Sequence, residues 1–299
     1  MAVCSYEIYV GKTCEPHKTD VSTYAKIFSM AQRRTVLGNL GFKSLMHRAG
    51  YFALDQLYPP TCISCETANM GGAGSKNLLC GRCWAKLRPI TPPLCPKLGL
   101  PFEYDMGADG LSAQAIAHPP PYNRARSAFV HMGVAKKLVS RLKFGDRPDL
   151  SEFCASLMAL AGKELFEETE EFGQPVLVPV PLHRGRQWQR RYNQSNELAK
   201  ALGKLVGLEV DPLIVRRVKK TRPQIGLSGE QRARNVSGAF LAEPNILERL
   251  GGRRVLIVDD VITTGSTINA LSKALLKAHV AHIDVISFSR VVIGIDDSL

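Results

Sequence analysis

The segment Val255–Thr267 constrains the fold of this 299-residue chain more than any other part of it. It begins with the aliphatic run Val255-Leu256-Ile257-Val258, which is typical of a buried parallel strand. The acidic pair Asp259-Asp260 follows, then a loop of Thr, Gly and Ser, and an amphipathic helix begins at Ile268. Ligands bind beyond the carboxyl ends of the strands in an open parallel sheet. The segment therefore predicts an α/β fold with a ligand site at this edge.

The loop in this segment is suited to bind a phosphate group. It offers backbone N–H groups and side-chain hydroxyls from Thr263, Thr264, Gly265, Ser266 and Thr267. The N-terminus of the following helix adds partial positive charge, and a glycine lets the backbone approach a phosphate closely. Adjacent carboxylates repel each other, and the vicinal hydroxyls of a ribose, with Mg²⁺ nearby, would explain why they stand together. Alternatively, the acids end a strand and a hydroxyl caps the helix.

Strand and helix patterns alternate through the second half of the chain. Strands are expected at Arg126–Met132, Val176–Val180, Arg253–Asp259 and Ile283–Ser289. Helices are expected at Val134–Leu142, 151–166, Asn196–Val206 and Ile268–Ala278. Short apolar strands separated by helices of this kind predict an open, mainly parallel sheet with helices on both faces.

Two basic segments accompany these elements. The first follows the strand Val176–Val180 directly and contains Arg184, Arg186 and Arg190, whose guanidinium forks match diphosphate oxygens. Two alternatives remain for this segment: a solvated basic loop, or a nucleic-acid surface on which Trp188 and Tyr192 stack on single-stranded bases. The second, Arg216–Phe240, is predicted as a long polar loop that closes over the site as a lid with glycine hinges. Its alternative is surface disorder.

Four of the eight cysteines form the pairs Cys62-x-x-Cys65 and Cys80-x-x-Cys83, which are separated by 14 residues. Two such pairs at this spacing predict a Cys₄ zinc ribbon, and four thiolates close the coordination sphere, which indicates a structural Zn²⁺. The alternative is two unrelated surface pairs. Cys154 is expected to pack within a helix.

Composition narrows the classes of partner and compartment. No run of 18 apolar residues is present and no apolar segment of a secretion signal begins the chain, so we expect a cytoplasmic protein without a membrane span. The net charge of +12 favours an anionic partner, either nucleic acid or a polyphosphate metabolite. A generally basic surface would give the same charge.

Together these segments resemble the ComF family, which is associated with competence and DNA uptake, over roughly residues 55 to 290. The resemblance rests on the cysteine pairs, Val255–Thr267, Pro179–Gln194, Thr221-Arg222-Pro223-Gln224 and Arg234-Asn235-Val236. Two departures stand out. Arg191 replaces the glycine of the family's R-G-[F/Y]-N-Q motif, and Cys95-Pro96-Lys97-Leu98 lacks the second cysteine of a third C-x-x-C pair.

The resemblance implies that Val255–Thr267 is the 5-phosphoribosyl-1-diphosphate (PRPP) motif of a type I phosphoribosyltransferase. Asp259 and Asp260 would be the catalytic pair that binds the ribose hydroxyls, Thr263–Thr267 would bind the 5-phosphate, and the three arginines would bind the diphosphate. The implied reaction transfers the phosphoribosyl group to a nitrogen nucleophile, with Mg²⁺ and release of diphosphate. Two alternatives are a non-catalytic single-stranded DNA-binding protein of the uptake machinery and a regulator that senses PRPP.

The same reading divides the chain into three parts. We expect an irregular leader over residues 1–45, a zinc-ribbon head over residues 46–120, and a phosphoribosyltransferase-like domain over residues 121–299.

Overall fold

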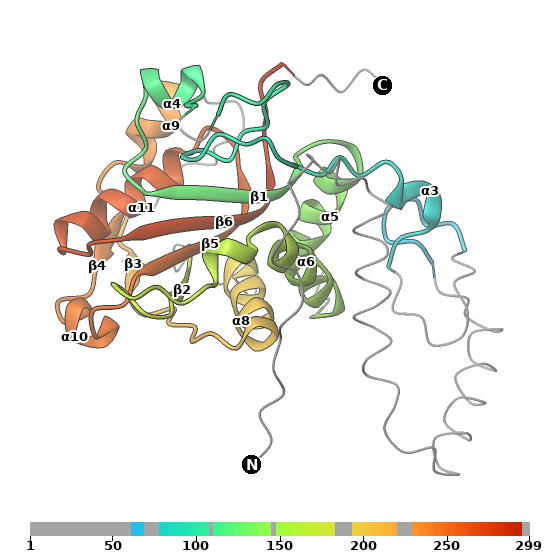
Figure 1. Cartoon of the computed structure of the whole chain (residues 1–299). Coiled ribbons are helices and arrows are strands. Elements are labelled where there is room, and N and C mark those ends of the chain that lie inside the picture. The colour runs from blue at the N-terminus through green and yellow to red at the C-terminus, as the bar shows by residue number, and fades with distance from the viewer. Residues whose placement is uncertain are drawn as a thin grey trace, which may run out of the picture.

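A computed structural model describes residues 61–68, 78–107, 110–144, 148–182, 193–219 and 229–294. Its centre is a four-stranded sheet in the order β1-β6-β5-β2 (Figure 1). The strands are β1 (Arg124–Val130), β2 (Val176–Pro179), β5 (Val255–Ile262) and β6 (Ile283–Arg290). All three pairings are parallel, so the predicted fold class is confirmed. The predicted leader lies outside the described residues.

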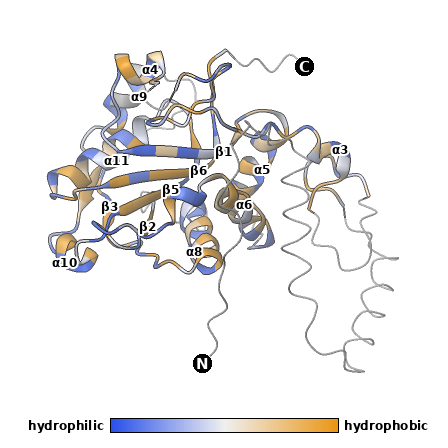
Figure 2. Cartoon of the chain, in the orientation of Figure 1, coloured by the Kyte–Doolittle hydropathy of each residue, from blue (hydrophilic) through white to orange (hydrophobic). Residues whose placement is uncertain are grey.

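Helices cover both faces of this sheet. The described helices are α3 (Gly81–Trp84), α4 (Ala113–Ala117), α5 (Gly133–Phe144), α6 (Pro148–Ala161), α8 (Gln194–Val206), α9 (Gly229–Val236), α10 (Ile246–Leu250) and α11 (Ser266–Lys277), with a 3₁₀ turn at Lys163–Leu165. Leu256 and Val258 of β5 pack with α5, α6 and α8, whereas Val255 and Ile257 pack with α11. Neighbouring strand residues therefore face opposite layers, and the continuous apolar run of β5 follows from that arrangement. Figure 2 shows the hydrophobic strands between these layers.

The strand β5 is longer than predicted. Its pairing with β6 continues past the acidic pair, through Asp259 opposite Ser287 to Ile262 opposite Arg290. The acidic pair therefore lies within the paired part of β5, and the neighbouring strand β6 fixes its backbone. The helix predicted over 151–166 is shorter, because α6 ends at Ala161.

The prediction of one long loop over Arg216–Phe240 is wrong for the described part of that segment. Two short antiparallel strands, β3 (Val215–Arg217) and β4 (Phe240–Ala242), flank the helix α9. Val236 and Ala239 are buried, and they hold this segment to the face that α11 covers. The family motif at Thr221–Gln224 lies outside the described residues.

Among the residues that the structure describes, no helix combines the length and the apolar character that crossing a bilayer requires.

Candidate functional site

The acidic pair lies near the carboxyl end of β5 in a protected position. Asp259 and Asp260 are 8% and 7% exposed. Asp259 Oδ1 accepts hydrogen bonds from the Ser195 hydroxyl at 3.0 Å and from the backbone N–H of Asp260 at 3.0 Å. Asp260 Oδ2 forms an ion pair with Lys143 Nζ at 3.2 Å. Asp259 is thus held by a residue of α8, and Asp260 by a residue of α5.

These two carboxylates carry more negative charge than their surroundings offset. Burial, and after it the nearby charge of Asp260, raise the pKa of Asp259 to about 7. Ser195, the Asp260 N–H and Lys143 act in the opposite direction but do not cancel this effect. A group that brings hydrogen-bond donors or a cation to this position would stabilise the ionised pair.

Sequence reasoning missed Ser195 and Lys143 as site residues. Ser195 is placed by Asn193, the N-cap of α8, whose side chain accepts from the Ser195 N–H at 3.2 Å and donates to the Val180 carbonyl at 3.0 Å. Gln194 then donates to the Lys143 carbonyl at 3.4 Å. The Asn-Gln pair therefore joins the end of β2, the start of α8 and the end of α5, and it was the available signal for Ser195.

The predicted phosphate loop follows β5 directly and leads into α11. Gly265 has φ +76°, a left-handed conformation that favours glycine, and it is the N-cap of this helix. The Thr264 and Ser266 hydroxyls are 2.8 Å apart, and the Ser266 N–H donates to Thr264 Oγ1 at 3.4 Å. The structure thus brings Thr263–Thr267 and the acidic pair together at the carboxyl end of β5.

The predicted diphosphate residues Arg184, Arg186 and Arg190 lie outside the described residues. The described chain leads into their segment from the carboxyl end of β2, which pairs with β5. Their segment therefore begins one strand away from the acidic pair.

The four paired cysteines form one cluster. The sulfur atoms of Cys62, Cys65, Cys80 and Cys83 all lie within 4.8 Å of one another, and Cys65 Sγ and Cys80 Sγ are 3.6 Å apart. A tetrahedral zinc with Zn–S bonds of about 2.3 Å separates its sulfurs by about 3.8 Å, so this donor set fits a structural Zn²⁺. Beside it, Trp84 of α3 packs edge-on against Phe153 of α6, with ring centroids 5.8 Å apart.

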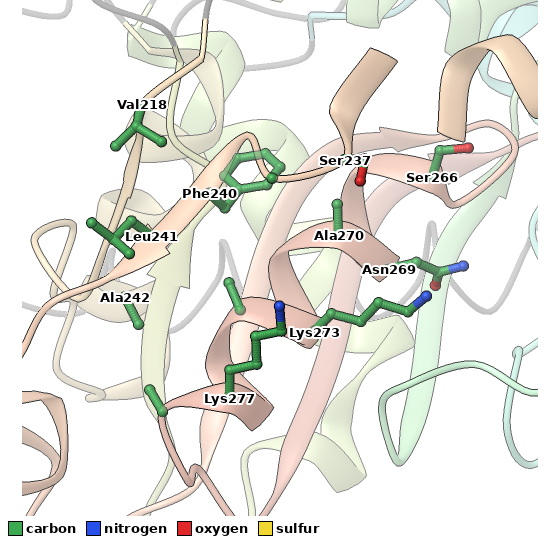
Figure 3. Close-up of a pocket in the computed structure, with 13 residues that line it drawn as sticks. Val218, Ser237, Phe240, Leu241, Ala242, Ser266, Asn269, Ala270, Lys273 and Lys277 are labelled. Carbon is green, nitrogen blue, oxygen red and sulfur yellow. The ribbon is translucent and has the colours of Figure 1, made fainter. Parts of the chain in front are cut away.

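A groove of about 610 Å³ lies beside the phosphate loop, between α11 and the antiparallel strand pair β3–β4 (Figure 3). One wall is polar and comes from α11, with Ser266, Asn269, Lys273 and Lys277. The other wall is mainly apolar, with Val218 and the strand β4. Among the described residues that line it, two are cationic and none is acidic.

This geometry defines a class of protein: a phosphoribosyltransferase-type α/β domain joined to an N-terminal cysteine cluster of the zinc-ribbon type. Two family models match, the double zinc ribbon domain over residues 53–115 and the phosphoribosyl transferase domain over residues 195–291.

Relatives extend the match over most of the chain. Competence protein F of Haemophilus influenzae is 33% identical over 230 residues, which cover 77% of this chain and 96% of that protein. The DNA utilization protein YhgH of Salmonella typhi is 33% identical over 210 residues, 69% of this chain and 88% of that one. Competence protein ComFC of Bacillus subtilis is 24% identical over 206 residues, 67% and 78% of the two chains. The chain belongs to the ComF family of competence proteins.

Proposed function

We propose that this protein binds PRPP at the carboxyl end of β5 and transfers its phosphoribosyl group to a nitrogen nucleophile, releasing diphosphate. The observation that carries the proposal is the adjacency of the buried Asp259-Asp260 pair and the hydroxyl-rich loop at the N-terminus of α11. A ribose 5-phosphate has the same order of groups, two vicinal hydroxyls and a phosphate, within one small ligand.

Each part of the site has a role in this proposal. The loop Thr263–Thr267 binds the 5-phosphate through N–H groups and hydroxyls, aided by the helix N-terminus. Asp259 and Asp260 accept hydrogen bonds from the ribose hydroxyls, while Ser195 and Lys143 hold the two carboxylates in place. Arg184, Arg186 and Arg190 are proposed to bind the diphosphate. Catalysis would then come from positioning and from stabilisation of charge on the leaving group.

The acidic pair also fits a magnesium ion, because Mg²⁺ prefers carboxylate oxygens and the charge of this pair is only partly offset. Bound with PRPP, Mg²⁺ would neutralise negative charge on the diphosphate. Lys143 contacts Asp260 at 3.2 Å, so this lysine already offsets part of the negative charge of the acidic pair.

Changing Asp259 and Asp260 together to asparagine tests the proposal. The shape of the site is kept, and burial already disfavours the charged form of Asp259, so the variant is expected to fold. PRPP affinity should fall roughly 100-fold, because a hydrogen bond to a charged acceptor contributes about 1.5–3 kcal/mol. Equilibrium binding of labelled PRPP with Mg²⁺ measures this.

A control with the same change in net charge is Glu103→Gln with Glu248→Gln, two exposed positions away from the site, which should leave PRPP affinity unaltered. Unchanged PRPP affinity in the folded double asparagine variant would contradict the assignment of this pocket as the PRPP site. Diphosphate release in the presence of nitrogen nucleophiles then separates a transferase from a regulator that only senses PRPP.

A second candidate function is binding of single-stranded DNA, and the groove along α11 favours it. Lys273 and Lys277 lie one helical turn apart, about 6 Å along the axis, with no acidic side chain among the described lining residues. Leu241 and Val218, which are 45% and 49% exposed, give the opposite wall an apolar surface for base faces. A strand could therefore place phosphates on one wall and bases on the other.

Substitution of Lys273 and Lys277 by glutamine is expected to reduce the salt dependence of oligonucleotide binding. Each phosphate contact contributes about 0.7 to the slope of log K against log salt for single strands, so the slope should fall in magnitude by about 1.4. Fluorescence anisotropy between 50 and 200 mM salt measures it, with Lys136→Gln and Lys204→Gln on other helices as the matched control. An unchanged slope in the groove variant would contradict this second function.

A further inference from the structure

The four-cysteine cluster is built on two turns of defined backbone geometry. In the first turn, the N–H of Cys62 donates to the Thr67 carbonyl and the N–H of Glu66 donates to the Cys62 carbonyl, both at 2.8 Å. Glu66 has φ +62°, and Thr61 forms a β-bridge with Ala68. In the second turn, Cys80 is the N-cap of α3, and the N–H of Trp84 donates to its carbonyl at 2.9 Å. We name this unit, residues 61–68 and 78–84, the first ribbon.

The same geometry recurs further along the chain, at the first turn of a second unit. The N–H of Cys95 donates to the Leu100 carbonyl and the N–H of Gly99 donates to the Cys95 carbonyl, again at 2.8 Å. Gly99 has φ +64°, and Leu94 forms a β-bridge with Pro101. Every one of these contacts matches its counterpart in the first ribbon, residue for residue.

The second turn of this unit matches as well. Ser112 is the N-cap of α4 with φ −65° and ψ 148°, close to the −70° and 159° of Cys80. The N–H of Ile116 donates to the Ser112 carbonyl at 3.1 Å, as that of Trp84 does to Cys80. We name residues 94–107 and 110–116 the second ribbon.

Aligning the two ribbons places Cys95, Leu98, Ser112 and Ala115 where the first ribbon has its four cysteines. Leu98 and Ala115 are 5% and 3% exposed and pack in one cluster with Cys95. Ser112 uses its hydroxyl to accept from the Ala115 N–H at 3.3 Å, as a helix cap. One thiol, one committed hydroxyl and two hydrocarbon side chains do not make a zinc site, so these residues do not fit the metal that a double zinc ribbon implies.

Contacts with the sheet stabilise the second ribbon in place of a metal. Arg290 at the end of β6 donates to the Leu98 carbonyl at 2.7 Å, and the N–H of Ala125 in β1 donates to the Lys97 carbonyl at 2.8 Å. Gly99 lies so close to β1 that a Cβ there would come within 2.2 Å of the Ala125 carbonyl oxygen. The turn is thus fixed against β1 by hydrogen bonds and by close packing.

We infer that the second ribbon is a metal-independent unit in which buried apolar side chains have replaced zinc, and that it belongs structurally to the sheet domain. The two ribbons together therefore bind one zinc ion, held by the first ribbon. Removal of that ion should release the first ribbon and leave the second one folded.

Metal analysis of the whole protein tests the inference. The native chain should hold one equivalent of zinc, and Cys95→Ala should keep it. The combined variant Leu98→Cys, Ser112→Cys and Ala115→Cys restores all four ligands on the same backbone and should hold two equivalents. Two equivalents of zinc in the native chain would overturn the inference, and so would loss of zinc in Cys95→Ala. A folded triple variant that held only one equivalent of zinc would overturn it as well.

Hydrogen exchange of the native protein keeps the test decisive should the triple variant fail to fold. After chelation, amides in residues 78–84 should lose protection, whereas those of Cys95, Gly99 and Ala125, whose partners lie within the second ribbon, should keep it. Equal loss of protection in both ribbons would show that the second one depends on metal.

Discussion

Changing Cys62 and Cys80 together to serine is expected to abolish zinc binding, from about one equivalent per chain to none. The two residues belong to different turns of the first ribbon, so the variant breaks the closed four-thiolate site from both sides. Zinc binding supplies about 10–16 kcal/mol to small structural sites of this kind, far more than the few apolar contacts of a four-residue helix can replace. The first ribbon should therefore unfold.

Metal analysis gives the stoichiometry, and hydrogen exchange shows which amides lose protection. Cys154→Ala is the matched control, because this cysteine is fully buried in α6 and is not part of the cluster. Protection in β5 and β6 should survive, since their core residues pack against helices of the sheet domain. A double serine variant that retained zinc would rule out the assigned ligands.

Replacing Arg254 with methionine is expected to lower the free energy of unfolding by about 3 kcal/mol. Arg254 and Asp284 are each 1% exposed, and Arg254 Nη1 donates to Asp284 Oδ2 at 2.9 Å. Arg254 also donates to the Leu165 carbonyl at 3.1 Å. Breaking a buried pair costs about 3–5 kcal/mol, and the lower end applies because Arg124 also contacts Asp284.

Urea denaturation at neutral pH measures the change, and the neighbouring Arg253→Met is its control. Arg253 pairs with Glu209 at 2.7 Å on the surface, where such a pair contributes about 1 kcal/mol or less. Equal destabilisation by the two substitutions would show that the buried pair adds nothing beyond ordinary side-chain packing.

The elements that could be predicted from the sequence are those with local signals. The aliphatic run of β5, the acidic pair and the Gly265 loop are contiguous, and their pattern is independent of the rest of the fold. The two cysteine pairs have the spacing of a ribbon, so their cluster was also predictable. Cys154 was expected within a helix, and it is buried in α6.

The missed features depend on contacts between distant segments. Lys143 reaches Asp260 from a helix that precedes it by more than a hundred residues, and no local pattern marks that contact. The strands β3 and β4 are only three residues long, too short for an alternating pattern, and they exist because they pair with each other. The second ribbon was not predicted as a unit because three of its four ligand positions do not carry cysteine, so that Cys95 is the one sequence signal and the backbone geometry identifies the rest.

Isothermal titration of the native protein with PRPP and Mg²⁺ tests the central claim most directly. We expect saturable binding at one site per chain, competition by ribose 5-phosphate, and weaker binding when Mg²⁺ is withheld. Affinity for PRPP should also vary less with salt than affinity for a single-stranded oligonucleotide, because the proposed site would contact only one phosphate and one diphosphate. Absence of PRPP binding in a protein that still binds the oligonucleotide would contradict the account.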